Sequence, residues 1–256
     1  PATAAFASTG SDQWVEIEAG LELGRFKTGA PTVVADSTIV ILRIDPRLWE
    51  FTLHSGGSKS AGEWCEAEGL SVATNAGMFA TDHRTHLGFM MSDDQINNPA
   101  WNSYQSVATF ESIGGEDHLF RILDADDADF SRQSVARLYR RAIQNLRLIK
   151  RERTNRWSPQ EKMWSEMALG EDSEGRALLI FCRSPYSMHD LNDILLSLPI
   201  NLVAAQHLEG GPEAQLFLDV GDTQMEFFGS YETGFNENDD NDRAWPIPNV
   251  IGVRPR

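Results

Sequence analysis

Three short turns, each joined directly to an apolar run, constrain the fold of this chain most strongly. They lie at residues 73–79, 208–213 and 245–253, and each combines glycine, asparagine or proline with neighbouring aliphatic residues. The apolar runs are typical of strands. Turns at strand ends are where a rigid scaffold offers backbone N–H groups and polar side chains to a ligand. The sequence therefore predicts a strand-rich scaffold with a binding site at the ends of its strands.

Much of the remaining chain also has the pattern of short strands. Apolar runs bounded by turn-forming residues predict strands at residues 38–45, 48–54, 70–74, 87–92, 106–111, 167–170, 177–182, 201–208 and 215–220. Pro46-Arg47 separates the first two runs and indicates a hairpin between them. The polar, acidic residues 232–243 show no periodicity, so we expect a loop there.

Helical periodicity is restricted to four segments. Residues 61–68 fit a short helix, and the apolar residues of 132–145 recur at i, i+3, i+4 and i+7, which predicts a longer one. Ser158-Pro159-Gln160-Glu161 is a capping box and predicts a third, short helix. Ser187 caps a fourth helix, which Pro199 ends.

The fourth helix lies between the predicted strands 177–182 and 201–208, and a strand–helix–strand unit of this kind predicts parallel strands. We therefore expect an α+β fold with a mixed, mostly antiparallel sheet, flanking helices and one β-α-β unit near residues 177–208. The chain has 256 residues, 41% of them hydrophobic, which is enough for one core. Residues 11–256 are expected to form a single domain.

The charge balance excludes several classes of partner. A net charge of −16 disfavours nucleic acid and anionic membranes, since both are bound by positive charge. No run approaches the roughly 18 apolar residues that suggest a membrane-spanning helix. A phosphate ligand would need a local basic group, such as Arg84, Arg147 or Arg254, or backbone amides, against a repelling overall field.

The N-terminus and the cysteines bear on where the protein acts. Ala5-Phe6-Ala7 before Ser8 has the small-x-small form of a signal-peptidase site. This pattern predicts a processed or flexible segment at residues 1–10 and an extracytoplasmic location, periplasmic or secreted. Cys65 and Cys182 fit either one disulfide of an exported protein or two buried free thiols.

The order of the motifs resembles one family, the phosphodiester glycosidases. The matching segments are Asn75-Ala76-Gly77-Met78-Phe79, Leu87-Gly88-Phe89, Gln144-Asn145-Leu146-Arg147-Leu148-Ile149, Ala168-Leu169-Gly170 and Pro248-Asn249-Val250-Ile251-Gly252-Val253. The resemblance spans roughly residues 38–254. It departs at the family's Leu-Asp-Gly-Gly-Gly-Ser, which is Leu208-Glu209-Gly210-Gly211-Pro212-Glu213 here. Where many members have Arg-Thr, this chain has Trp164-Ser165-Glu166-Met167.

The resemblance implies a hydrolase that cuts a sugar–phosphate glycosidic bond. It makes Glu209 the acid/base or nucleophilic carboxylate, with Asn75 orienting the sugar and Arg147 binding phosphate. The remaining expected substrate contacts are Gly77, Gly210, Gly211, Glu213 and Ser165. Glycosidases need one group at the anomeric carbon and another at the leaving oxygen, and a phosphate leaving group needs little protonation. The expected partner is a carbohydrate or sugar phosphate, with no cofactor.

Three other hypotheses remain open from the residues. The changes around Glu209 fit a glycan-binding relative without turnover. His83 and His86 are three residues apart and fit a metal-dependent hydrolase using a divalent metal, although their segment has loop character. A partner-binding scaffold would have no pocket at the three turns. The acidic residues 124–129 lack the glycine and distal glutamate of a helix–loop–helix calcium site, so we expect a solvated surface there.

Overall fold

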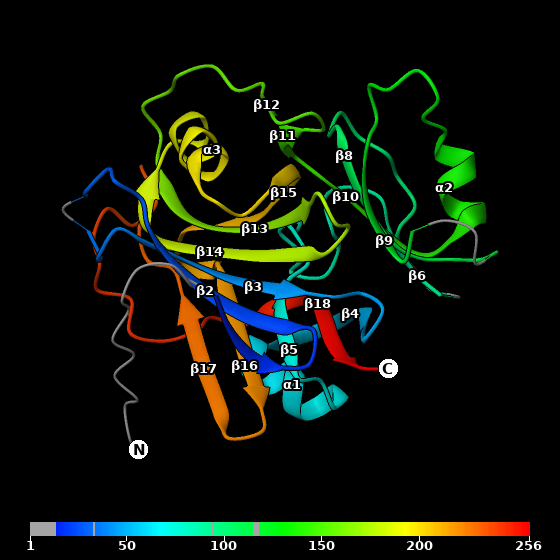
Figure 1. Cartoon of the computed structure of the whole chain (residues 1–256), viewed down its shortest axis with the longest axis horizontal. Helices are drawn as coiled ribbons and strands as arrows, with labels where there is room; N and C mark the ends of the chain where they lie inside the picture. The colour runs from blue at the N-terminus through cyan, green and yellow to red at the C-terminus, as the bar shows by residue number, and fades with distance from the viewer. Residues whose placement is uncertain (1–13, 33, 94, 115–117) are drawn as a thin grey trace.

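Antiparallel strands dominate the computed structural model, which describes residues 14–32, 34–93, 95–114 and 118–256 (Figure 1). The predicted N-terminal segment 1–10 lies outside the described residues. A large sheet has eight strands in the order β1 (Trp14–Glu18), β2 (Leu21–Lys27), β3 (Thr38–Ile44), β14 (Ala177–Tyr186), β13 (Trp164–Asp172), β15 (Leu202–Gly210), β11 (Arg147–Lys150) and β12 (Thr154–Asn155).

Two five-stranded sheets pack beside the large sheet. The β8–β10 sheet has the order β7 (Gln95–Asn98), β6 (Met90–Ser92), β10 (Tyr139–Asn145), β8 (Ser106–Ser112) and β9 (Phe120–Asp124). The β5–β18 sheet has the order β17 (Thr223–Phe228), β16 (Gln215–Val220), β5 (Val72–Asn75), β18 (Ile247–Pro255) and β4 (Trp49–Lys59). The helical segments are α1 (Ala61–Glu68), α2 (Arg132–Leu138), α3 (Met188–Ser197) and the 3₁₀ turn η1 (Gly211–Glu213).

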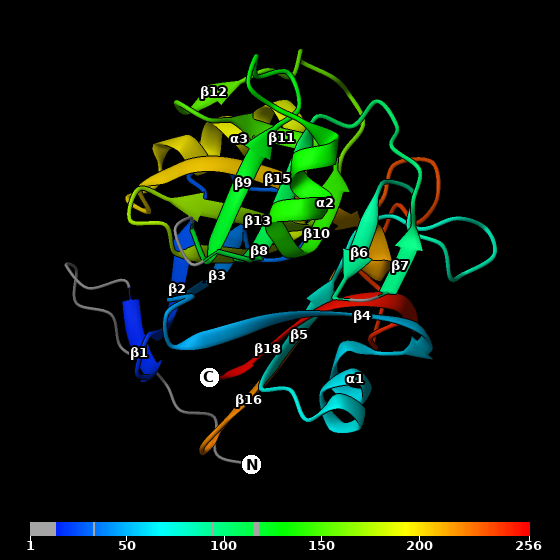
Figure 2. The same ribbon diagram turned by 90° about the vertical axis from the view of Figure 1, so that its right-hand side faces the viewer.

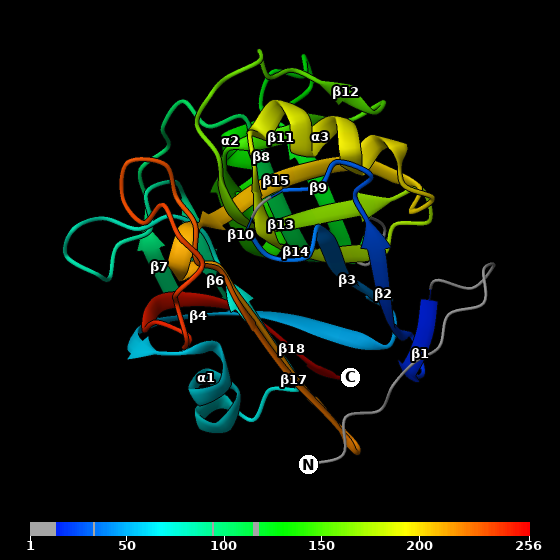
Figure 3. The ribbon, with the colours of Figure 1, turned by 90° about the vertical axis from the view of Figure 1, so that its left-hand side faces the viewer.

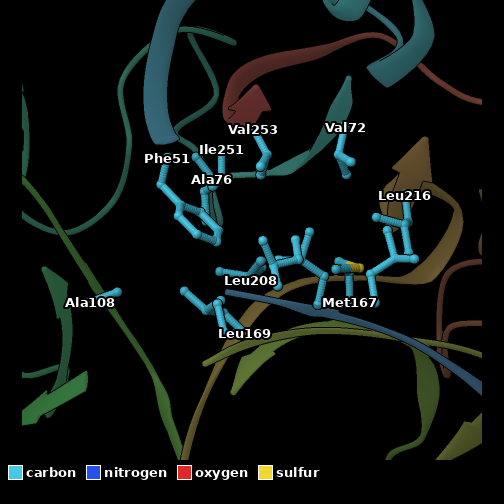
Figure 4. Packing of buried hydrophobic residues seen from close by; sticks show 14 of the residues in the cluster. Phe51, Val72, Ala76, Ala108, Met167, Leu169, Leu208, Leu216, Ile251 and Val253 are labelled. Carbon is cyan, nitrogen blue, oxygen red and sulfur yellow. The ribbon is translucent and has the colours of Figure 1, made fainter. Parts of the chain in front are cut away.

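The main core lies where the three sheets face one another (Figure 4). Met167 and Leu208 of the large sheet point toward Val72 and Ile251 of the β5–β18 sheet, and all four are fully buried. Phe51 stacks on two rings of the β8–β10 sheet, with ring centroids 5.3 and 5.8 Å away. Each large apolar side chain buried in this way contributes roughly 1.5–3 kcal/mol. These contacts hold the strand ends, and the site built on them, in fixed positions.

The helices cover the outer faces of the sheets (Figures 1 and 2). α3 packs on the large sheet through Leu191 and Leu195, and α1 packs on the β5–β18 sheet through Trp64. α2 lies over the β8–β10 sheet and buries Val135. The helices 61–68 and 188–197 were correctly predicted, and the N-cap of the second, Ser187, accepts a hydrogen bond from the Asp190 N–H.

The predicted helix 132–145 is correct only in its first half. α2 ends at Leu138, and the chain continues directly into β10. β10 is inserted between β6 and β8 and bonds to both, so its backbone is paired on two edges. Arg140 is the only exposed residue of this strand. Pairing and burial on both sides outweigh a helical pattern whose intrinsic preference is worth a fraction of a kcal/mol per residue.

Two other expectations about local structure are wrong, and the β-α-β unit near residues 177–208 is correct in strand direction only. Strands β3 and β4 do not form a hairpin, because β3 pairs with β2 and β14 while β4 pairs with β18. No helix follows Ser158, whose segment lacks a repeating apolar face that tertiary packing could bury. Strands β14 and β15 are parallel in direction, but β13 lies between them and pairs antiparallel with each. The recorded pairs between described strands are all antiparallel, so the sheet is not mixed.

The structure decides between the two states that the sequence left open for the cysteines, one disulfide or two free thiols. Cys65 lies on α1 and Cys182 on β14, and both are buried free thiols, so no disulfide joins them. Burial raises the pKa of the Cys65 thiol to about 12 and also raises that of Cys182. Among the described residues, no helix is long and apolar enough to cross a membrane.

Candidate active site

A cavity opens where β15 ends and the chain turns into η1. Its volume is about 190 Å³, and its wall consists of Met78, Leu146, Trp157, Trp164, Met188, His207, Glu209, Gly210 and Glu232. In Figure 3 the end of β15 lies beside the orange loop that leads from β17 to β18, which supplies Glu232. The cavity therefore combines a predicted catalytic corner with side chains from six other segments of the chain.

Two glycines allow this corner to be tightly enclosed. Gly211 has φ +62°, a left-handed conformation that glycine adopts without strain, and a Cβ there would lie 2.7 Å from the Glu232 Oε2. A Cβ on Gly210 would lie 2.5 Å from the Trp164 ring. Glycine at both positions lets Trp164 and Glu232 approach the strand end closely.

Glu209 has the properties of a proton donor. Its side chain is 9% exposed at the cavity wall. Burial raises the pKa of Glu209 to about 8, with a further upward contribution from Glu213 that the nearby His207 opposes. One carboxyl oxygen accepts a hydrogen bond from the Gly210 N–H, at 3.1 Å. At neutral pH this carboxyl group is mainly protonated, which is the state that a general acid requires.

A buried pair that sequence reasoning missed lies next to Glu209. The Nδ1 of His207 is 2.7 Å from the Glu166 Oε1, and the Trp164 Nε1 donates to the Glu166 Oε2 at 2.8 Å. Burial raises the pKa of Glu166. At His207 burial opposes protonation, but the negative charge of Glu166 outweighs it and the pKa is raised. The two groups are close enough to titrate as a unit.

Two further carboxyl groups stand near the same corner. The pKa of Glu213 and that of Glu232 are both raised, by burial first, and at Glu213 also by repulsion from Glu232. Burial and then the charge of Glu209 raise the pKa of Tyr104, which places this tyrosine close to the site. The site therefore holds several carboxyl groups in unequal environments, the arrangement from which acid and base roles arise.

Asn75 does not line the cavity, although it was predicted to orient the sugar. It is 1% exposed, and its carboxamide donates to the Glu213 carbonyl at 2.9 Å and accepts from the Gln215 N–H at 2.7 Å. Both ends of the side chain thus bind the turn that carries Glu213. Its geometry is that of a residue that positions a carboxyl group, and direct contact with a sugar is not supported.

Ser165, expected among the substrate contacts, is also fully buried. Its Oγ donates to the Arg183 carbonyl at 2.6 Å and accepts from the N–H groups of Ser230 and Tyr231 at 3.0 and 3.1 Å. These bonds tie the beginning of the loop that carries Glu232 to β13. Ser165 therefore anchors one wall of the cavity from behind.

Arg147 does not line the cavity and its guanidinium pairs with acidic side chains, so a phosphate contact is not favoured. Its Nη1 is 2.8 Å from carboxylate oxygens of both Asp124 and Asp126, and the side chain is 12% exposed. Its backbone carbonyl accepts a hydrogen bond from the Trp157 Nε1 at 2.7 Å. Arg147 thus fixes an aromatic wall residue, while its guanidinium is neutralised by the acidic residues 124–129.

Close packing explains why the turn at residues 73–79 has a glycine at position 77. It has φ +154°, and an added Cβ would lie 2.2 Å from the Asn145 Oδ1 and 2.5 Å from the His86 Cε1. The absence of a side chain lets this turn settle on Asn145 and His86, so that the next residue, Met78, lines the cavity. Gly77 is required here by close packing.

The metal hypothesis based on His83 and His86 is not favoured by this geometry. His86 is fully buried, its Nε2 donates to the Gln144 carbonyl at 2.8 Å, and burial lowers its pKa to about 4. Within residues 14–32, 34–93, 95–114 and 118–256 there is no group of three or more His, Cys, Asp or Glu side chains arranged to hold a metal ion.

Carboxyl groups with raised pKa values stand beside tryptophan side chains at the end of a strand, an arrangement that suits acid–base chemistry on a sugar. The chain belongs to the phosphodiester glycosidase family, whose family model matches residues 68–254. A search of curated proteins found no significant match.

Solved structures show the same fold. The catalytic domain of zebrafish N-acetylglucosamine-1-phosphodiester alpha-N-acetylglucosaminidase, described as auto-inhibited by its pro-peptide, is similar with a TM-score of 0.64 and 14% identity. That match covers 94% of this chain and 86% of the zebrafish chain. A hypothetical protein from Synechocystis is similar with a TM-score of 0.57 and 13% identity, over 95% of this chain and 63% of its own. At these identities the likeness establishes the fold.

Proposed function

We propose that this protein is a hydrolase that cleaves the glycosidic bond between a sugar and a phosphodiester, with Glu209 as proton donor. The observation that carries the proposal is the position of Glu209: a carboxyl group whose pKa is raised to about 8 stands in the wall of a cavity at a glycine turn. Membership of the phosphodiester glycosidase family supports the substrate class. The export predicted from the N-terminal sequence is part of the same proposal.

In the proposed reaction Glu209 donates its proton to the glycosidic oxygen. The bond from the anomeric carbon to that oxygen breaks, and its electron pair stays on the departing phosphate oxygen. Water adds to the anomeric carbon from the opposite side as this bond breaks, and Glu213 or Glu232 accepts its proton. The side chains of Trp157 and Trp164 form apolar walls for the sugar ring.

The family's aspartate is Glu209 here, which moves the carboxyl group by about one methylene. Misplacement of a catalytic group by about 1 Å can cost roughly 100-fold in rate. The compensating feature is the enclosure of Glu209 by Trp164 and Glu232, which the glycines at 210 and 211 permit. The Glu209 carboxyl group is therefore displaced from the position of the family's aspartate but enclosed by neighbouring side chains, and we expect the enzyme to retain turnover.

The test is hydrolysis of a panel of sugar 1-phosphodiesters, including N-acetylglucosamine and neutral sugars, by the wild type, Glu209→Gln and Glu66→Gln. Glu66 is exposed on α1 and controls for the loss of one negative charge. We expect release of free sugar by the wild type and the control, and a loss of at least about 100-fold in Glu209→Gln. Silence across the panel with sugar phosphates still raising the Tm would identify a glycan-binding relative and refute the proposal.

A further inference from the structure

The cavity has an acidic wall and one basic side chain. Of the described residues that line it, Glu209 and Glu232 carry carboxyl groups, and His207 alone has a side chain able to become a cation. A phosphodiester carries a negative charge throughout its cleavage, so an acidic cavity needs a compensating group. With the Arg147 guanidinium held by Asp124 and Asp126, that group has to be sought elsewhere.

The orientation of His207 is fixed by its partner. Its Nδ1 lies 2.7 Å from a carboxylate oxygen of Glu166, and because a carboxylate accepts, Nδ1 carries the hydrogen. Nε2 is left as the nitrogen available to a ligand, since it has no hydrogen-bond partner in the described part of the chain and the ring lines the cavity. A buried imidazole directed by a carboxylate in this way presents one defined nitrogen.

Glu166 is itself held in place. Its second oxygen accepts from the Trp164 Nε1 at 2.8 Å, and the Trp164 ring meets the His207 ring edge-on with centroids 6.3 Å apart. The titratable groups that face His207 are the acidic side chains of Glu166 from β13, Glu209 from its own strand and Glu232 from the loop before β18. The negative charge of Glu166, whose carboxylate oxygen lies 2.7 Å from Nδ1, is the largest influence that favours the imidazolium.

We propose that the Nε2–H of His207 binds the phosphate of the substrate and stabilises it as it departs, with Glu166 as the positioning residue. The inference rests on the proposed function for its substrate, and it gives the site a cation that this reaction needs. No proton leaves His207 in this step: Glu209 protonates the glycosidic oxygen, and the imidazolium donates a hydrogen bond to a non-bridging phosphate oxygen. Cleavage and anion binding are thereby assigned to different residues.

The test measures binding of inorganic phosphate by calorimetry to the wild type, His207→Asn, Glu166→Gln and His118→Asn, an exposed histidine as matched control. Loss of a charged hydrogen bond predicts phosphate binding about 10- to 100-fold weaker in His207→Asn and unchanged in His118→Asn. Phosphate affinity is expected to fall as pH rises through the pKa of His207, and in Glu166→Gln that fall moves to lower pH.

Ring ¹⁵N spectra of the wild type and Glu166→Gln give a second readout that does not depend on the folding of His207→Asn. We expect a lower His207 pKa in Glu166→Gln, and in the wild type a phosphate-induced shift at Nε2. Equal phosphate affinity in His207→Asn and the wild type, or no shift at Nε2, would overturn the inference. Phosphate binding through His207 without sugar release would instead refute the proposed function and the role of His207 in phosphate departure, and would leave only the phosphate-binding site at His207 standing.

Discussion

Replacing Glu209 with glutamine is expected to stabilise the protein in alkaline solution and to leave its stability nearly unchanged in acid. The folded state raises the pKa of Glu209 from 4.5 to about 8. A carboxyl group whose pKa is raised holds its proton more tightly in the folded state, so it lowers stability as pH rises from 4.5 to about 8. Below this window both states are protonated, and glutamine is a close neutral replacement.

The size of the effect follows from the same shift. At about 1.36 kcal/mol per pKa unit, the rise from 4.5 to about 8 corresponds to roughly 5 kcal/mol. Glu209 as a residue is 9% exposed, and local relaxation in the charged state reduces the penalty. We therefore expect Glu209→Gln to gain roughly 2–4 kcal/mol over the wild type above about pH 8.

Urea unfolding followed by tryptophan fluorescence, at about pH 5.5 and about pH 9, measures this difference directly. Glu66→Gln is the matched control, because it removes one negative charge from an exposed position on α1. The gain should be small at the lower pH, large at the higher pH and absent from the control. A gain that does not change with pH, or no gain at alkaline pH, would refute the assignment of Glu209 as a buried group with a raised pKa.

Three further predictions address the surroundings of the site. Gly77→Ala should destabilise the protein by about 2–4 kcal/mol in urea unfolding, because its Cβ would lie 2.2 Å from the Asn145 Oδ1; an unchanged midpoint would contradict the packing described. Arg147→Ala should lower the free energy of unfolding by about 1–3 kcal/mol, because its guanidinium pairs with Asp124. KM should change less than about threefold. A large rise in KM at unchanged stability would show that Arg147 binds the phosphate after all. Chelator should leave sugar release unaffected, and lost activity restored by a divalent metal would return weight to the metal hypothesis.

The local rules of the sequence correctly predicted three of the four expected helix starts and most strands, and they failed mainly where pairing between distant segments decides. Ser187 is an N-cap with its expected bond, because capping involves only neighbouring residues. β10 has a helical pattern and becomes a strand because β6 and β8 bond to both its edges. The same reason separates β3 from β4. No spacing within 38–54 reveals that other strands already occupy the edges of β3.

The sequence predicted the part of the site at the Glu209 turn, but it did not predict the buried pair of His207 and Glu166. Glu209 and the glycines after it follow a strand, a signal visible in the sequence. His207 could also have been found, because residues two apart on a strand point to the same face. Glu166 could not, since its approach to His207 depends on β13 pairing with β15 across a register shift between Met167 and Ala168.

Asn75, which belongs to a segment that carries the family resemblance, and Ser165, which lies where the chain departs from the family pattern, both act behind the carboxyl groups. Asn75 holds the turn of Glu213 through the Glu213 carbonyl, and Ser165 holds the segment leading to Glu232 through two backbone N–H groups. Neither side chain lines the cavity. Both side chains thus fix the backbone that carries a carboxyl group, and neither depends on the identity of that group. On this argument Asn75→Ala should lower kcat by moving Glu213, which separates a positioning role from direct binding of the sugar, where KM would rise first.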